Sequence, residues 1–202
     1  MVLEQDLTDG RSDDLVATFS LDNAPVRGRI ARVGLDAIDP ILRRHDYPRP
    51  VAMLLGEALT LAALVGSLLK IEGRLIVQAQ GDGPCELLVA EHRANGGLRG
   101  YARIAQGAME KLARSHRMTP AALLGSGKLV MTLDRGEGDL TQGVVELSGD
   151  TLARCAENYF RTSEQTETRI RLAVGEVMSA NAPPLWRGGG PSCRRKKARV
   201  SA

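Results

Sequence analysis

Residues 51–69 read VAMLLGEALTLAALVGSLL, the longest apolar stretch of the chain. An apolar run of this length, rich in Ala and Leu, predicts a helix. Its apolar residues lie on every face of that helix, so we expect burial on all sides. The run is also long enough to span a membrane, but Glu57 interrupts it, and a carboxylate at mid-depth costs about 2.5–3.5 kcal/mol. We therefore predict a buried central helix, with a membrane span over residues 51–69 as the alternative.

Shorter segments with the composition and alternation of β-strands lie on both sides of this helix. They are residues 15–20, 26–33, 74–80, 86–92, 98–104, 128–134, 142–147 and 168–174. The turn-forming residues 81–84 separate two of these segments and predict a hairpin. Most connections are of this kind, so the sequence predicts an α+β fold. We expect mostly antiparallel β-sheets packed around the buried apolar helix, with flanking helices.

Capping residues indicate where the flanking helices begin and end. Asp39 predicts an N-cap, with a proline at the first helical position after it. Thr119 predicts another helix start, and Gly125 closes that helix. Residues 107–117 favour a further short helix, and residues 150–162 an amphipathic one. The apolar face of the amphipathic helix consists of Leu152, Cys155, Ala156, Tyr159 and Phe160.

The amino-acid composition of the chain changes at Pro183. Three glycines and a proline at residues 188–191 precede a basic run with no apolar periodicity. This composition predicts a folded core over residues 1–182 and a basic, disordered tail over residues 183–202.

The positive net charge belongs to this tail. Residues 187–202 hold six of the 27 basic residues and no acid, which leaves 21 basic against 24 acidic residues in the rest of the chain. An acidic main body does not indicate a nucleic-acid partner. The tail also has no aromatic residue after Trp186 on which bases could stack. We therefore expect no nucleic-acid partner and, with the central helix buried, no membrane partner.

The residue types that carry metal or redox chemistry are scattered. Cys85, Cys155 and Cys193 lie 70 and 38 residues apart, without the spacing of a metal site or a redox pair. The histidines show no ligand spacing either; they are His45, His92 and His116. The N-terminus lacks the basic and apolar regions of a secretory signal, so we expect a cytoplasmic protein with reduced thiols.

One glycine-rich segment resembles a phosphate-binding loop at first sight. In Gly125–Lys128 the lysine is followed by Leu129 instead of Ser or Thr, and Ala122 stands where the first glycine belongs. A helix precedes the segment, whereas a phosphate loop opens one, so we interpret it as a helix end. The sequence thus predicts no catalytic, cofactor-binding or metal-binding residue, and a protein that is not an enzyme. A nucleotide enzyme using this loop is the distant alternative.

Glu57 is the one residue whose predicted burial is costly. The simpler interpretation is that its helix face reaches solvent or a basic partner. The functional interpretation is a polar latch that keeps the helix from packing too stably and releases it under stress.

A set of short motifs, in order along roughly residues 15–180, resembles a known family. They are VRGR at 26–29, HDYPRP at 45–50, VQAQGDGP at 77–84, LRGYAR at 98–103, GSGKL at 125–129, QGVV at 142–145, GDTL at 149–152, Tyr159-Phe160 and Ser163-Glu-Gln165. Each motif alone is weak, but the set resembles the thirty-three-kilodalton chaperonin family, the redox-regulated heat-shock holdases of bacteria.

The resemblance implies a β structure around a buried helix, a homodimer, and ATP-independent binding of unfolding client proteins that prevents their aggregation. It also implies, for full-length relatives, a C-terminal zinc module with four cysteines and a metastable linker. This sequence shows neither, so no zinc ligand is transferred and we expect no cofactor in this chain. Relatives continue after Gly189 into a Leu-rich strand, and its loss predicts an uncovered sheet edge. We expect other forward frames after codon 189 to encode the strand, linker and zinc motif.

Overall fold

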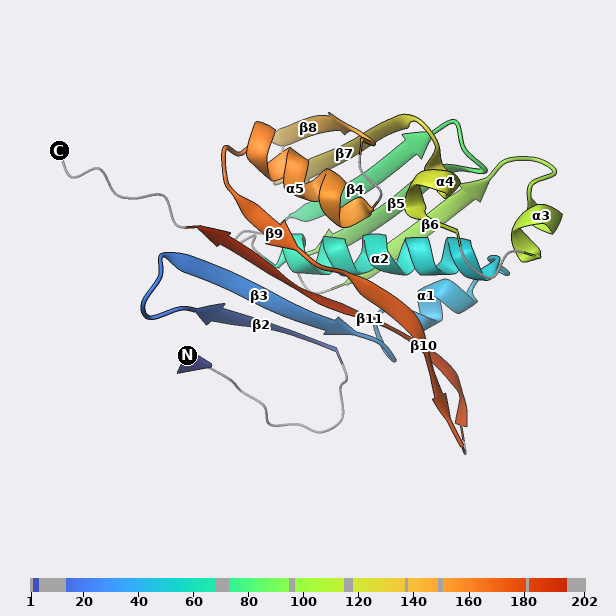
Figure 1. Ribbon diagram of the computed structural model, residues 1–202, viewed down its shortest axis with the longest axis horizontal. Helices are drawn as coiled ribbons and strands as arrows, with labels where there is room; N and C mark the ends of the chain where they lie inside the picture. The colour runs from blue at the N-terminus through green and yellow to red at the C-terminus, as the bar shows by residue number, and fades with distance from the viewer. Residues whose placement is uncertain are drawn as a thin grey trace.

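The computed structural model describes residues 2–3, 14–67, 73–94, 97–114, 118–136, 138–148, 151–180 and 182–195. Within these residues the chain forms two antiparallel sheets with one long helix, α2 (Arg49–Gly66), between them (Figure 1). Helix α2 contacts strands of both sheets. The predicted α+β fold, antiparallel sheets around a buried apolar helix with flanking helices, is confirmed.

The sheet that we call sheet A joins the two ends of the chain. Its strands are β1 (Val2–Leu3), β2 (Leu15–Ser20), β3 (Val26–Val33), β9 (Thr168–Ile170), β10 (Ala173–Ser179) and β11 (Ala182–Arg195). Hydrogen-bonded neighbours follow the order β1-β2-β3-β11-β10, and β9 also pairs with β11. Strand β11 therefore lies at the centre of the sheet, with β3 on one side and first β10, then β9, on the other.

Sheet B is built from the middle of the chain. Its strands are β4 (Arg74–Gly81), β5 (Cys85–Arg93), β6 (Leu98–Ile104), β7 (Gly127–Asp134) and β8 (Leu140–Glu146), in the order β6-β5-β4-β7-β8. The predicted hairpin across residues 81–84 is present, with Val77 opposite Ala90. Alternate residues of β4 are buried, as expected for a strand with one face on the core.

In the described ranges, four shorter helices flank these layers: α1 (Asp39–Arg43), α3 (Met109–Ala113), α4 (Pro120–Leu124) and α5 (Leu152–Thr162). The predicted caps of α4 are confirmed. The Thr119 hydroxyl accepts a hydrogen bond from the Ala122 amide at 3.1 Å, and Gly125 ends the helix with a φ of 67°. Glycine suits that position because other residues rarely adopt a positive φ.

The predicted role of Asp39 as an N-cap is wrong. Asp39 is the first helical residue, and the carboxylate does not bond to an amide of its own helix. It accepts hydrogen bonds from the Arg43 guanidinium at 2.8 Å and from the Trp186 amide at 2.9 Å. The Trp186 amide, 147 residues away in sequence, takes the place of the helix amide that an N-cap would bind. This buried carboxylate therefore fixes β11 to α1.

Helix α2 is the core of the domain and the alternative of a membrane span has no support. The helix passes the length and hydropathy test for a span, but 83% of that window is buried inside the fold. Its side chains pack against apolar residues from both sheets, such as Val33 of β3 and Leu88 of β5. The neighbours that bury the apolar faces are protein strands.

The predicted disorder of residues 183–202 is wrong for residues 183–195, which belong to β11. Gly188 and Gly190 allow this strand to run close to its neighbours. A Cβ atom at Gly188 would lie 2.3 Å from Thr60 Oγ1 of α2, and one at Gly190 would lie 1.8 Å from the Arg171 carbonyl oxygen. The strand also occupies the edge of β3 that was expected to be uncovered. Composition indicates disorder, but pairing on both sides satisfies the backbone. Residues 196–202 lie outside the described residues.

Candidate functional site

The three cysteines are thiols on three different elements, β5, α5 and β11. Cys85 is 0% exposed and Cys155 is 2% exposed, whereas Cys193 is partly exposed on β11. Burial raises the pKa of the Cys85 thiol to about 11, so this sulfur stays protonated and unreactive at neutral pH. Over the described ranges, no group of three or more His, Cys, Asp or Glu side chains lies close enough to hold a metal.

The histidines are not brought together either. His45 is exposed and its ring lies 5.2 Å from that of Tyr47. His92 is buried against Gly66 at the end of α2, where burial lowers its pKa, which favours the neutral ring. His116 lies outside the described residues.

The glycine-rich segment Gly125–Lys128 is the end of α4 and the start of β7, as predicted. Its polar groups bond to the β4–β5 turn. The Asp82 carboxylate accepts a hydrogen bond from the Ser126 amide at 2.7 Å, and the Gly83 amide donates to the Leu124 carbonyl at 2.9 Å. A carboxylate thus occupies the position at which a phosphate-binding loop would hold its anion.

Glu57 lies on the one face of α2 that is not fully buried. Among the described residues, none forms a hydrogen bond or an ion pair with it, so the expected basic partner is not found there. Burial raises the pKa of Glu57 from its ordinary value of 4.5 to about 7. The folded protein therefore binds a proton on Glu57 at mildly acidic pH that the unfolded chain releases.

Replacing Glu57 by glutamine is expected to stabilise the fold above pH 7. Below pH 4.5 both states are protonated and the side chain has no effect. As the pH rises from 4.5 through about 7, the charged form costs the folded state progressively more. A pKa difference of this size between the folded and unfolded states corresponds to about 3 kcal/mol in the free energy of unfolding. Because Glu57 keeps partial contact with solvent, we expect Glu57→Gln to gain about 2 kcal/mol.

Urea unfolding of wild type and Glu57→Gln between pH 4 and pH 8 measures this effect. Glu110→Gln, at an exposed position of α3, is the matched control and should change little. A constant difference between wild type and Glu57→Gln over this pH range would contradict the assignment.

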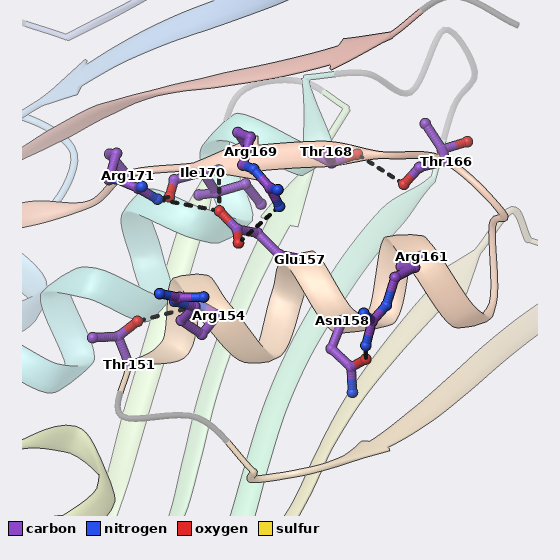
Figure 2. A network of polar contacts seen from close by, with 10 residues as sticks. All are labelled: Thr151, Arg154, Glu157, Asn158, Arg161, Thr166, Thr168, Arg169, Ile170 and Arg171. Atoms are coloured by element: carbon purple, nitrogen blue, oxygen red, sulfur yellow. Dashed lines mark hydrogen bonds and ion pairs between the residues drawn. The ribbon is translucent and has the colours of Figure 1, made fainter.

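A buried carboxylate on α5 forms the main polar link between that helix and sheet A (Figure 2). Glu157 is 8% exposed, and its Oε1 accepts hydrogen bonds from the Ile170 amide at 2.8 Å and from Arg171 Nη1 at 3.2 Å. Its other oxygen lies 3.7 Å from Arg169 Nη1. Figure 2 shows this carboxylate pointing at β9, while Arg154 and Arg161 bond within their own segment.

Sequence reasoning missed this link, although one signal was present. Arg169 and Arg171 alternate with the buried Ile170, so their side chains share the face of the strand opposite to the core. Glu157 is a neighbour of Ala153 (i−4) and Phe160 (i+3), at the edge of the apolar face of an amphipathic helix. An acid on such a face, together with two arginines on the next strand, could have suggested an ion pair.

The surface carries large apolar side chains on several elements. They are Val16, Leu21, Ile30, Leu35, Tyr101, Met109, Leu140, Val144, Val177 and Met178. The most exposed are Met178 at 74%, on the β10–β11 hairpin that projects from the domain in Figure 1, and Leu140 at 61%, on the edge strand β8. On the hairpin, Val177 lies opposite Leu185 in the strand register. We call Val177, Met178 and Leu185 the hairpin-tip cluster.

Comparison with known proteins agrees with this architecture. The family model described as Hsp33 protein matches residues 14–182. The chain belongs to the Hsp33 family. The "33 kDa chaperonin" of Caulobacter vibrioides is 54% identical over 183 residues, which cover 90% of this chain and 60% of the relative. The "33 kDa chaperonin" of Escherichia coli is 40% identical over 164 residues, or 81% of this chain and 54% of the relative.

A solved Hsp33 structure shares the fold. The crystal structure of the 33 kDa chaperonin from Thermotoga maritima matches with a TM-score of 0.74 at 23% identity, covering 91% of this chain and 61% of that one. The chain thus spans about 60% of the length of the Caulobacter Hsp33. The family match ends at residue 182, so most of β11 lies beyond it.

Proposed function

We propose that this Hsp33 chain is a holdase: an ATP-independent, cytoplasmic molecular chaperone that binds partly unfolded proteins and prevents their aggregation. Holding a client requires exposed apolar surface but no catalytic group. The observation that carries the proposal is the hairpin-tip cluster together with the exposed Leu140 and Val144 on the edge strand β8. An edge strand offers unpaired backbone groups to an extended client segment, and apolar side chains beside it add contact area.

ATP independence and the absence of enzymatic activity follow from the same reasoning. The Asp82 carboxylate accepts the hydrogen bond from the Ser126 amide that a phosphate would otherwise receive, so we expect an equilibrium nucleotide-binding assay to detect no ATP binding. We further propose a homodimer, as the family resemblance implies. Sedimentation velocity of the purified chain tests that assembly independently of client binding.

We also propose that client binding by these 202 residues does not depend on the redox state. The most buried thiols, on Cys85 and Cys155, are enclosed in the core, and Cys193 lies on a different sheet from Cys85. We therefore expect oxidation to form no disulfide that would uncover new surface. The apolar surface is exposed in the resting fold, so protection of clients should require no activation.

Replacing Met178 by aspartate is expected to weaken client protection. A charge at the hairpin-tip cluster must be desolvated when an apolar client segment binds, at a cost that lowers affinity. The concentration of chaperone that halves the aggregation of a heated client should rise at least about threefold, since a loss of about 0.7 kcal/mol already has that effect.

The matched control is Met109→Asp on α3, where the methionine is 44% exposed and lies outside the cluster. It should protect nearly as well as wild type. Equal protection by Met178→Asp and wild type at every ratio would remove the hairpin-tip cluster from the binding surface.

A further inference from the structure

A cavity of about 410 Å³ lies between sheet A and the C-terminal ends of helices α2 and α5. This volume falls within the range of about 300–1,000 Å³ that is typical of small-molecule sites. Its wall comes from β2, β3, β9 and β11, and its base includes Val65 of α2 and Phe160 of α5.

The strand register arranges the wall in two rows. Thr18, Arg29, Ser192 and Ile170 are successive cross-strand partners, and so are Ser20, Arg27, Arg194 and Thr168. Cross-strand partners point to the same face of a sheet. All eight line the cavity. The wall thus combines three guanidinium groups with four hydroxyl groups.

No acid balances these arginines within the described part of the chain. The cavity lining contains no Asp or Glu, and none of the ion pairs formed by described residues involves Arg27, Arg29 or Arg194. Arg27 and Arg194 lie directly opposite each other, and like charges in that position destabilise a sheet. Burial and the charge of Arg194 lower the pKa of Arg29, whose Nη1 donates a hydrogen bond to Ser67 Oγ at 3.0 Å.

An anion bound between the two rows would replace the repulsion among the arginines by attraction to a shared negative charge. Guanidinium groups bind phosphate and carboxylate through paired, charge-assisted hydrogen bonds, and hydroxyl groups can donate to the remaining oxygens. Three positive charges favour a head group with two negative charges over one with a single charge.

The base of the cavity is apolar. Val65 is nearly buried, and Phe160 is a partly buried neighbour of the core that keeps some exposed surface. A bare inorganic anion would leave the exposed part of Phe160 in water, whereas an apolar tail would cover it and gain about 25 cal/mol per Å² of surface removed from water.

We propose that this cavity is a binding site for a phosphate monoester with an apolar tail. The head group lies between Arg29 and Arg194, and the tail lies against Val65 and Phe160. Ser192 and Arg194 lie beyond residue 182, where the match to the family model ends. Ligand binding in this cavity does not depend on client binding. The site could therefore be present even if the chain did not act as a chaperone.

Isothermal titration of the full 202-residue chain with octyl phosphate, below its micelle concentration, tests the proposal. We expect one saturable site per chain. Inorganic phosphate, which lacks the tail, and octanoate, which carries a single charge, should each bind at least about tenfold more weakly. Octyltrimethylammonium has the same tail with a positive head and should show no saturable binding.

Two variants locate the site. Arg29→Gln and Arg194→Gln should each weaken octyl phosphate binding about tenfold or more, as expected for the loss of a charged hydrogen bond. Arg99→Gln, at an exposed position of β6 in sheet B, is the control and should bind within twofold of wild type. Without ligand, Arg194→Gln should melt no lower than wild type because the repulsion with Arg27 is gone, but the rise in Tm caused by octyl phosphate should be lost.

Saturable binding of octyltrimethylammonium equal to that of octyl phosphate would overturn the proposal, because the site would then be merely apolar. Octyl phosphate binding that is the same in Arg29→Gln, Arg194→Gln and Arg99→Gln would overturn it as well. Either result leaves the client-protection assays unaffected.

Discussion

Alanine at position 190 is expected to lower the free energy of unfolding by about 3 kcal/mol or more, because the new Cβ atom meets rigid backbone. It would lie 1.8 Å from the Arg171 carbonyl oxygen and 2.8 Å from its carbonyl carbon. The adjacent backbone cannot simply turn away, since the Arg171 amide donates a hydrogen bond to the Pro191 carbonyl at 3.0 Å. The strands β9 and β11 must therefore separate, and with them the centre of sheet A.

For a domain of this size, such a loss lowers the Tm by about 6–12 °C. Calorimetry or thermal circular dichroism of Gly190→Ala measures it. The matched control is Gly175→Ala on β10, where no atom lies within 4 Å of the added Cβ, and its Tm should be unchanged or slightly raised. If Gly190→Ala melts like Gly175→Ala, residue 190 is not in a central strand.

Removal of the Glu157 carboxylate should cost about 2–3 kcal/mol, most of it from one backbone group. The Ile170 amide, in a residue that is 0% exposed, loses the acceptor at 2.8 Å, and an unsatisfied buried donor costs about 1–3 kcal/mol. Arg169 and Arg171 have side chains 72% and 71% exposed, so water solvates them and their ion pairs contribute little. We therefore expect Glu157→Ala to be far more damaging than Glu157→Gln, whose amide oxygen still accepts.

Urea unfolding compares these variants, with Glu167→Ala in the exposed α5–β9 connection as the control. Amide hydrogen exchange at Ile170 gives a local readout: it should accelerate at least about tenfold in Glu157→Ala and remain slow in Glu167→Ala. Slow exchange at Ile170 in Glu157→Ala would mean that another group holds β9 in place.

Segments with strong local patterns were predictable from the sequence. The strands at residues 15–20, 26–33 and 98–104 have the predicted bounds, because alternation and flanking turns define them locally. The central helix begins two residues earlier than predicted, at Arg49. Proline is tolerated in the first helical turn, so Pro50 does not stop the helix.

Features that depend on distant partners were not predictable. Strand β11 has a composition typical of a linker, and its hydrogen bonds come from the neighbouring strands β3, β10 and β9, which are distant in sequence or unremarkable in pattern. Asp39 has the local signature of a cap, but Trp186 competes for the carboxylate. The cationic cavity assembles Thr18, Arg29 and Arg194 from three separate strands, and their proximity follows only from the sheet order.

Light scattering of a thermally unfolding client shows whether this chain is a holdase that needs no redox activation. The full 202-residue chain is added in reductant and, separately, after treatment with peroxide, in both cases without ATP. We expect equal suppression of aggregation under both conditions, because Val177 and Met178 of the hairpin-tip cluster are exposed in the resting fold. Protection that appears only after oxidation would contradict it, since that result requires a thiol switch, and absence of protection under both conditions would contradict the chaperone function itself.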